Sequence, residues 1–396
     1  MKITTLFLTF LVVGNLMAKD EISIFHYNIK ELDSTKLIKT NEQIKAVEEI
    51  VKNFNFDLLS LNEIQYDFPN VPNTSYKSKG ENLKKIQTLL GLENLTFISF
   101  DPANTGLNAK PDSNGEYFIK PNSPRAREHA DQINFGTLPG QYSSGLLSKY
   151  KIVDKKVISK IKWKEFNPKI DLTKFSTASG DKYPEDTELF DKNFSDITIS
   201  FNSKELHLII LHTVPSFHFG NMKTPNYQRN KDQLRFLEWY LTGSTDIKVN
   251  LPSIKPLEKD SYFIATGDWN TAFSSTENPG SEILRRLDIK AKFWKDPKSF
   301  SFTNEGDGFS KSPLRLMLDY ILISKNIDIL EAKIIHPKFN RTQLGCKKKP
   351  TNTTNDQVLV SWTEKKKTCY ALVSPEDKLF KAASDHYPLY GRFELK

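Results

Sequence analysis

The sequence predicts one domain of the α/β class. Short apolar runs alternate along its 396 residues with segments whose apolar positions recur at helical spacing. No internal repeat and no long low-complexity tract interrupts this alternation, and no clear linker divides it. The length alone permits one large domain or two ordinary ones. Many strands with interspersed helices and no linker favour a single α/β domain.

The N-terminal part is expected to alternate strand and helix. Residues 22–27 form an apolar run that predicts a strand, and residues 57–61 predict the next one. Between them, over 44–54, apolar residues recur three and four positions apart, which is typical of a helix. A second helix is expected over 83–90, where leucine and isoleucine recur in the same way.

Residues 101–141 differ from the rest because Pro, Gly, Asn and Asp dominate them. This composition predicts a long loop region, and long structured loops in compact domains are usually functional or mobile. Beyond it, a helix is expected after Tyr227, with Leu234, Leu237 and Leu241 on one face. The remaining predicted strands lie at 145–148, 206–211, 262–265, 318–323 and 387–395.

The first 18 residues are expected to be a secretory signal peptide. Lys2 precedes an apolar run from 3 to 17, and Ala18 comes before a polar stretch. The run is shorter than the roughly 20 apolar residues that span a bilayer, and no later segment resembles a membrane helix. We therefore expect a mature, monomeric protein over 19–396 that is secreted or periplasmic. A buried first strand or a retained anchor is the alternative.

Charge and cysteine content add two weaker expectations. The formal charge of +8 favours anionic partners such as nucleic acid, phospholipid headgroups or phosphate esters. Cys346 and Cys369 form an even pair, which in an oxidising compartment indicates one disulfide. The loop between them carries lysines at 347–349 and 365–367, so we expect a basic hairpin stapled by that disulfide. Two unpaired buried thiols are the alternative.

Polar side chains that can bind a metal follow four of the predicted strands. Asn28 and Glu63 come directly after the first two strands, and His212 follows the strand at 206–211. Asp268 ends the run that begins at 262, with Asn270 two residues further on. Sites in α/β folds gather at strand ends, where a rigid sheet positions the side chains. The recurrence indicates one shared site, although any one of these residues alone would more often be a surface residue.

The residue types favour one kind of chemistry. Asn and Glu supply oxygen ligands, which suit a hard ion, so Mg²⁺ is expected, with Mn²⁺ or Ca²⁺ as alternatives. The sequence contains no Cys-rich pattern and no His-Glu-x-x-His pattern, either of which would indicate zinc. The sequence also lacks a Gly-rich P-loop and a Gly-x-Ser-x-Gly elbow. These absences argue against nucleotide-driven phosphoryl transfer and against serine hydrolase chemistry.

The same residues lie in stretches that resemble the endonuclease/exonuclease/phosphatase superfamily, which includes deoxyribonucleases, abasic-site endonucleases, bacterial sphingomyelinases and inositol-phosphate phosphatases. The resemblance implies a four-layer α/β/β/α sandwich with two packed, mainly antiparallel β-sheets flanked by helices. Residues 135–142 further resemble a secreted bacterial branch. The matching stretches, in the family's order, are Tyr27-Asn28-Ile29, Leu61-Asn62-Glu63, Ser144-Gly145-Leu146-Leu147-Ser148-Lys149-Tyr150, Leu211-His212-Thr213, Thr266-Gly267-Asp268-Trp269-Asn270, Leu318-Asp319-Tyr320-Ile321-Leu322 and Ser384-Asp385-His386.

The resemblance implies roles for the residues around the metal. Glu63 is expected to be a metal ligand, with Asn28 completing or supporting the shell and Asp385 contributing to it. Asp268 would orient or deprotonate the attacking water. Asn270 would donate a hydrogen bond to the phosphoryl group.

Four further residues are expected at the phosphate. Asp319 lies inside an apolar strand, where a carboxylate needs a partner, and it would fix the tautomer of His386 and favour the imidazolium. His386 would contact the phosphate or act as an acid–base group. His212 would protonate the leaving oxygen or stabilise developing charge, and its carboxylate partner is not identifiable from the sequence. Arg229, which opens a helix, would bind phosphate through its guanidinium fork or else be a surface arginine.

The sequence therefore predicts a secreted, divalent-metal-dependent phosphoester hydrolase with a single catalytic domain of this family over 19–396. A phosphodiesterase or nuclease is the main hypothesis. A phosphomonoesterase and a sphingomyelinase-like phospholipid headgroup hydrolase are alternatives among enzymes. A non-catalytic binding module would be expected to lose ligands, and all eight expected polar positions are present. The substrate is left open among DNA, RNA, phospholipid and small phosphate esters.

Overall fold

The computed structural model describes residues 20–120, 123–306, 308–310, 312–346 and 356–396. The expected signal peptide at 1–18 and the lysines at 347–349 lie outside these ranges. Within them, the strands form two six-stranded sheets and one three-stranded sheet. None of the helices in the described ranges is long and apolar enough to cross a bilayer.

The first large sheet runs through the N-terminal and C-terminal strands. Its central pair, β1 and β2, is parallel, and all its other neighbours are antiparallel. The two ends of the described chain therefore lie in one sheet. In spatial order its strands are β11 (Ile327–Ile334), β15 (Leu389–Leu395), β1 (Glu21–Leu32), β2 (Leu58–Ile64), β4 (Ser143–Ser148) and β3 (Phe97–Phe100).

The second large sheet has the same mixed character. Its strands β7 and β8 are parallel, and the other pairs are antiparallel. Each large sheet thus contains one parallel pair whose carboxyl ends face the same edge. In spatial order its strands are β5 (Ile152–Ile158), β6 (Phe194–Phe201), β7 (Lys204–Leu211), β8 (Tyr262–Asp268), β10 (Asp319–Ile323) and β9 (Lys292–Phe293).

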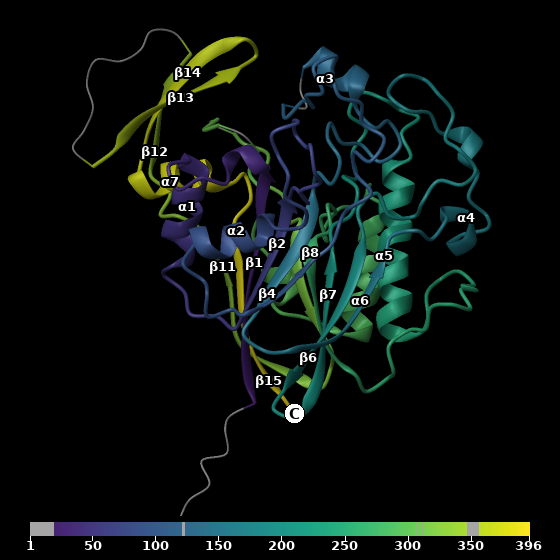
Figure 1. Cartoon of the computed structure of the whole chain (residues 1–396). Coiled ribbons are helices and arrows are strands. Elements are labelled where there is room, and N and C mark those ends of the chain that lie inside the picture. Colours follow the sequence, from purple (N-terminus) through teal and green to yellow (C-terminus); the bar gives the residue numbers. More distant parts are fainter. Residues whose placement is uncertain (1–19, 121–122, 307, 311, 347–355) are drawn as a thin grey trace, which may run out of the picture.

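Helices cover the outer faces of both sheets (Figure 1). On the first sheet these are α1 (Glu42–Val51), α2 (Asn82–Leu89) and α7 (Pro375–Ala383), and on the second α5 (Asn226–Thr242) and α6 (Gly280–Lys290). Helix α1 begins after Asn41, whose side chain accepts hydrogen bonds from two first-turn N–H groups. The order helix, sheet, sheet, helix confirms the predicted four-layer α/β/β/α sandwich. Short helices α3 (Pro124–His129) and α4 (Trp163–Phe166) lie in loops, as do the 3₁₀ turns η1 (Ser34–Lys36), η2 (Leu172–Lys174) and η3 (Pro297–Ser299).

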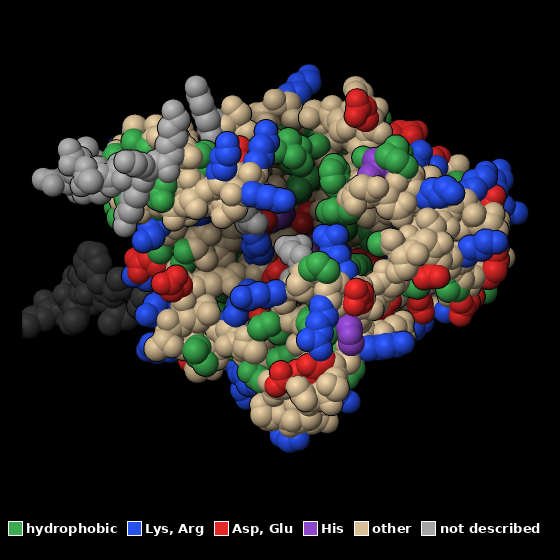
Figure 2. Space-filling view, turned by 90° about the horizontal axis from the view of Figure 1, so that it is seen from above, with side chains coloured by type: hydrophobic (Ala, Val, Ile, Leu, Met, Phe, Trp, Pro, Cys, Tyr) green, Lys and Arg blue, Asp and Glu red, His purple; other side chains and the backbone are tan. Residues whose placement is uncertain are grey.

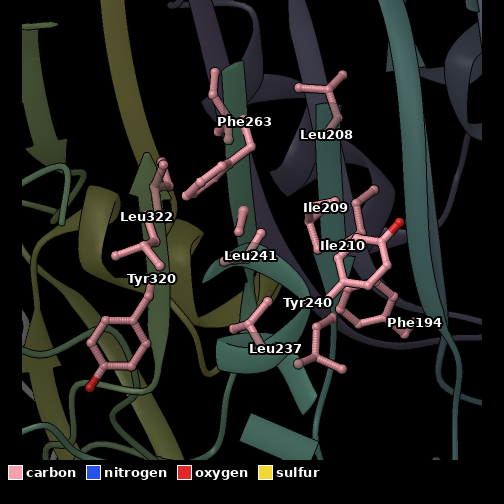
Figure 3. Packing of buried hydrophobic residues seen from close by; sticks show 14 of the residues in the cluster. Phe194, Leu208, Ile209, Ile210, Leu237, Tyr240, Leu241, Phe263, Tyr320 and Leu322 are labelled. Atoms are coloured by element: carbon pink, nitrogen blue, oxygen red, sulfur yellow. The ribbon is translucent and has the colours of Figure 1, made fainter. Parts of the chain in front are cut away.

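The cores follow from the alternation of side chains along the strands. On β1, Ile22 and Ile24 join the cluster shared with the second sheet, whereas Phe25 and Tyr27 join the cluster under α1 and α7. Figure 3 shows the side chains of α5, among them Tyr240, beside those of β7. Burial of such a side chain contributes about 1.5 to 3 kcal/mol. Both sheets are therefore held rigidly, and so are the residues at their edges.

The three-stranded sheet was only partly predicted. The expected hairpin is present as β13 (Val358–Glu364) and β14 (Lys367–Val373), and Cys346 and Cys369 form a disulfide. A third strand, β12 (Arg341–Gly345), pairs with β14 and was not anticipated. It connects to the body through Arg341, which donates to Glu305 and Asp377, both buried.

Most predicted elements are present with shifted ends, and several were missed. The helix after Tyr227 and the strands at 206–211 and 318–323 correspond to α5, β7 and β10. The described residues among 101–141 are largely irregular, as expected, apart from α3. Strand β5 is exposed along most of its length and lacks an apolar face, so it carried no signal. Helix α6 buries only three apolar side chains and α7 only two, so neither carried a clear helical pattern.

Gly267 allows the two neighbouring strands to approach just before Asp268. Its φ is +152°, and a Cβ at this position would lie 1.8 Å from the carbonyl oxygen of Leu211. We expect Gly267→Ala to lower the free energy of unfolding by about 2 to 3 kcal/mol, because the overlap is with backbone. Urea unfolding monitored by circular dichroism would measure the loss.

The matched control is Gly243→Ala at the end of α5. Gly243 also has a positive φ, +75°, but a Cβ there would meet nothing within 4 Å. Only backbone strain remains, so this variant should lose about 1 kcal/mol. Equal losses in the two variants would contradict the steric explanation.

Candidate active site

The carboxyl ends of the two parallel pairs meet at one place. Asn28 of β1 donates through Nδ2 to Glu63 Oε1 (3.0 Å) and to Asp268 Oδ2 (3.1 Å). Asn62 Oδ1 accepts from the backbone N–H of Asp268 at 2.9 Å. The two bonds to Asp268 join the first sheet to the second. The predicted strand-end residues are therefore close together, although they are far apart in sequence.

His212 completes this group from the end of β7. Its Nε2 lies 3.6 Å from Asp268 Oδ2 and 4.0 Å from Glu63 Oε1. One ligand atom from each of Glu63, His212 and Asp268 lies within 4.8 Å of the others. The carboxylate partners of His212, which could not be identified from the sequence, are therefore Asp268 and Glu63.

Asp319 and His386 form a second group that shares Asp268. His386 Nδ1 lies 2.7 Å from Asp319 Oδ2, and His386 Nε2 lies 3.8 Å from Asp268 Oδ2. Asp319 and Asp268 are direct partners across β10 and β8. Like charges in one register are unfavourable, so a cation is needed between them, and His386 supplies one.

The two carboxylates of this group, Asp319 and Asp268, differ in the direction of their pKa shifts. Burial alone would lower the pKa of His386, but Asp319 and Asp268 raise it to about 10. Burial would raise the pKa of Asp319, yet attraction to His386 and the contact from His26 hold it below its usual range. Burial, followed by the charge of Asp319, raises the pKa of Asp268 to about 7. His386 and Asp319 therefore form an imidazolium–carboxylate pair, and the carboxyl group of Asp268 beside them has a pKa near 7.

His212 is in the opposite electrostatic state. Burial first, and then the positive charge of Lys192, holds the pKa of His212 well below its usual value. Its Nδ1 is buried and has no hydrogen-bond partner among the described residues. We conclude that His212 is neutral, with Nε2 facing the carboxylates.

Asn270 and Asp385 border the two groups. The backbone N–H of Asn270 donates to Asp268 Oδ1 (2.9 Å), and its side chain donates to the carbonyl oxygen of Thr213 (3.1 Å). Asp385 lies 3.5 Å from Lys30 Nζ and belongs to neither metal-capable group. Its neighbour His386 nevertheless places it at the same edge.

Arg229 lies apart from the site. It is buried at the start of α5 and donates to the carbonyl oxygens of Leu189, Ile133 and Glu188 and to Asn134 Oδ1. These bonds tie the 131–134 segment and the 188–189 segment to the helix. Its contacts are those of a structural residue, and none of them faces Asp268 or Glu63.

Sequence reasoning missed two side chains close to the site. Lys192 is buried and donates to Asp191 Oδ2 (2.7 Å) and to the carbonyl oxygen of Thr213 (3.2 Å). His26 Nε2 lies 3.5 Å from Asp319 Oδ1, so Asp319 sits between two histidines. The signal for His26 was available, because it is a polar residue on the inward face of a buried strand.

A backbone hydrogen bond braces Glu63 from the C-terminal end of β1, where the pairing of β1 with β2 is irregular. The backbone N–H of Glu31 donates to Glu63 Oε2 (2.9 Å), and Tyr142 Oη donates to Glu31 Oε1 (3.1 Å). Lys30, Glu31, Glu63, Tyr142 and Asn270 all have positive φ values between 44° and 65°. Such conformations are strained for non-glycine residues and cluster at functional sites. Lys30, Glu31 and Glu63 lie where the pairing of β1 and β2 is irregular, so the strained backbone coincides with the strand ends that carry the site.

The donor set fits a hard divalent ion. Glu63, Asp268 and Asp319 bring carboxylate oxygens into one buried region, where uncompensated negative charge is costly. Asp319 Oδ1 lacks a hydrogen bond there. Oxygen-rich sites of this kind suit Mg²⁺, Mn²⁺ or Ca²⁺. The Asn28 oxygen accepts from the backbone N–H of Lys30, so its amide nitrogen is the atom that faces Glu63.

The sequence model of the Endonuclease/Exonuclease/phosphatase family matches residues 26–386. Among curated proteins, no match to this sequence was found. Similar solved structures include an endonuclease/exonuclease/phosphatase from Beutenbergia cavernae, at 13% identity and a TM-score of 0.49, covering 95% of this chain and 72% of that one. The catalytic domain of human Nocturnin with bound sulfate shares 14% identity over 96% of both chains, with a TM-score of 0.46. A mannosyl-6-phosphatase from Bacteroides thetaiotaomicron shares 12%, over 94% of this chain and 99% of that one, with a TM-score of 0.44.

The raised pKa of His386 makes stability depend on pH in the metal-free protein. Because its folded pKa of about 10 lies above the ordinary value, protonation of His386 stabilises the fold fully below about pH 6.5 and is lost as pH rises through 10. Asp268, with its pKa raised to about 7, likewise loses stabilisation as pH rises through 7. We expect the free energy of unfolding in chelator to fall between pH 7 and 10.

The control is the same titration on His386→Asn. Other groups also ionise in this range, so the readout is the difference between the two slopes. The variant should lose less stability than the wild type from pH 7 to 10. Parallel curves would show that His386 does not carry the effect.

Proposed function

The chain belongs to the endonuclease/exonuclease/phosphatase family, and from that premise we propose that it is a secreted, Mg²⁺-dependent phosphodiesterase. Members of this family are metal-dependent phosphoester hydrolases, so the reaction class is given, and the proposal concerns the bond, the ion and the location. The observation that carries it is the convergence of Glu63, His212, Asp268, Asp319 and His386 at one edge of both sheets. The same edge gathers the strained backbone described above.

Each residue has a role that its surroundings support. Glu63 would hold the ion, and Asn28 would orient Glu63 through its amide N–H. A divalent ion at this place supplies positive charge to a phosphoryl oxygen. Asp268, with its pKa near 7, is suited to accept a proton from the attacking water.

The two histidines would act on different oxygens. His386 is protonated and held by Asp319 through Nδ1, so Nε2 can donate to a phosphoryl oxygen. His212 is neutral, so it would donate a hydrogen bond from Nε2 rather than a full proton. Asn270 is tied to Asp268 and Thr213 and would complete the contacts to phosphate.

The charge at the site favours a diester over a monoester. Four carboxylates, Glu63, Asp268, Asp319 and Asp385, face few fixed cations, chiefly His386, with Lys192 and Lys30 at the border. A phosphodiester carries one negative charge, whereas a monoester near neutral pH carries close to two. The singly charged ester therefore meets less repulsion in the same setting.

Two features support export. The first 18 residues have the charged start, apolar centre and small final residue of a signal peptide. The Cys346–Cys369 disulfide is of a kind that persists outside the cytoplasm. Immunodetection in cell fractions would place the protein.

A substrate panel tests the chemistry. We expect the purified protein with Mg²⁺ to hydrolyse bis-p-nitrophenyl phosphate faster than p-nitrophenyl phosphate, with both rates lost in chelator. Plasmid DNA, RNA and phospholipid would be compared in parallel, and Mn²⁺ and Ca²⁺ would be tried in place of Mg²⁺. Glu63→Gln should reduce kcat by about 100-fold or more, because it removes a carboxylate from the metal group. Chelator-resistant hydrolysis, or full activity in Glu63→Gln, would overturn the proposed site.

The role of His212 can be measured separately. His212→Ala should lower kcat on bis-p-nitrophenyl phosphate by about 100-fold, while Mg²⁺ binding followed by calorimetry stays in place. His129→Ala is the matched control, because His129 is a half-buried histidine on α3 whose hydrogen bond is to Lys110 and not to any of these residues. Equal rates in the two variants would remove His212 from the mechanism.

A further inference from the structure

The loop between β7 and α5 exposes three large apolar side chains. Phe217, Phe219 and Met222 are 57%, 67% and 77% exposed. A single exposed apolar residue is normal on a soluble protein, whereas a cluster marks a contact surface. We call residues 215–224 the apolar loop.

The apolar loop leaves directly from the active site. Thr213, next to His212, accepts hydrogen bonds from Asn270 and Lys192 through its carbonyl oxygen. Val214 is fixed by Gln233 and Asn230 of α5. Phe217 follows three residues later, so its position is tied to that of the catalytic group.

Hydrogen bonds on both sides hold the apolar loop in shape. Asn226 donates to the carbonyl oxygen of Phe217, and Asn221 donates to those of Ser176 and Thr177. The rings of Phe217 and Phe219 pack edge to face, with centroids 5.1 Å apart. The apolar side chains are therefore presented to solvent by an ordered loop, which lowers the entropy cost of binding.

Other apolar side chains lie on the same side of the molecule. Ile119 is exposed and lines a small cavity with Glu63 and Tyr142. Phe135 is exposed beside Ile133 and Asn134, which Arg229 ties to the start of α5. Figure 2 looks onto this side and shows a central hollow with acidic and histidine side chains inside it and both hydrophobic and Lys or Arg side chains around it.

The charges near the apolar loop are few and mixed. Lys223 is exposed in the loop, and Lys182 and Asp181 are exposed on the segment that pairs with it through Ser176. A surface for nucleic acid would interleave aromatic side chains with a row of cations along the strand. Here methionine accompanies the two rings and the local net charge is small, so apolar contact must supply the binding.

We propose that the apolar loop docks the protein on a phospholipid bilayer, so that the site acts on phospholipid headgroup diesters. The inference rests on the proposed phosphodiesterase function and names its substrate class. A ligand that places a phosphodiester in the hollow and apolar chains against the apolar loop is an amphiphile. Aromatic side chains suit the interface between headgroups and acyl chains.

Binding to vesicles tests the docking without turnover. The wild-type protein in chelator should co-sediment with phosphatidylcholine vesicles, and the triple variant Phe217→Ser, Phe219→Ser, Met222→Ser should bind at least about tenfold more weakly. The control is Ile289→Ser, because Ile289 is 75% exposed near the C-terminal end of α6. The opposite end of this helix is the one near the site, since a Cβ built on Gly280 would lie 2.5 Å from Asn230 Oδ1. The control should bind as the wild type does. Equal binding by the triple variant and the wild type would overturn the proposal.

A single-residue probe gives an independent readout. Phe219→Trp should show a blue-shifted emission with vesicles, beyond any change in the wild type, because the new indole leaves water. Binding should also persist at about 0.5 M salt, whereas phosphate-backbone contacts weaken steeply with salt. An unshifted emission would contradict docking. Oligonucleotide binding by the wild type that is lost in the triple variant, with no vesicle binding by either protein, would identify nucleic acid as the partner and overturn the proposal.

Turnover separates this inference from the proposed function. Vesicle phosphatidylcholine should lose its headgroup with the wild type and Mg²⁺, at least about tenfold faster than with the triple variant. Chelator-sensitive hydrolysis of bis-p-nitrophenyl phosphate without vesicle binding would sink the docking and leave the phosphodiesterase intact. Vesicle binding without hydrolysis of any ester would instead sink the phosphodiesterase, and with it the assignment of phospholipid as substrate.

Discussion

The hydrogen bonds that join Asn28 to Glu63 and to Asp268 are the constraint on which the site depends. The bond to Asp268 connects the first sheet to the second at the carboxyl ends of the two parallel pairs, and the bond to Glu63 links the two strands of the first pair. Asn62 adds a bond to the backbone of Asp268. Because the sheets are held by cores on both faces, these few polar contacts fix the distance between groups that are more than 200 residues apart in sequence.

This meeting of the sheets also creates an electrostatic problem. Asp268 and Asp319 stand opposite each other in one register, and Glu63 approaches from the other sheet. His386 pairs with Asp319, whereas burial, followed by the charge of Asp319, raises the pKa of Asp268 to about 7. A divalent ion would relieve the remaining repulsion, so affinity for metal follows from the cost of burying these carboxylates together. His212, kept neutral by burial and by Lys192, adds no further charge.

The sequence predicted those parts of the fold and site that follow from regular structure. Asn28, Glu63, His212 and Asp268 could be placed because each follows a buried strand. The missed groups lie where no periodicity operates: Lys192 precedes β6 after an irregular stretch, and its approach to His212 is a tertiary contact. Arg229 shows the reverse case, because its position at a helix start suggested phosphate binding, whereas its donors are used by loop carbonyls. Which atom of Asn28 faces Glu63 likewise depends on the turn at Lys30.

The apolar loop and the catalytic group are parts of one continuous segment. The backbone carbonyls of Thr213 and Val214 accept hydrogen bonds from Asn270, Lys192 and Asn230, and Phe217 follows three residues later, so the exposed rings are anchored close to the site. A surface that binds these rings is therefore held at a fixed distance from Asp268 and His386. A phosphate at the headgroup level of a bilayer meets this requirement, because it lies at a set depth relative to the acyl chains that the rings would contact. Substrate selection would then arise from geometry as much as from the chemistry of the headgroup.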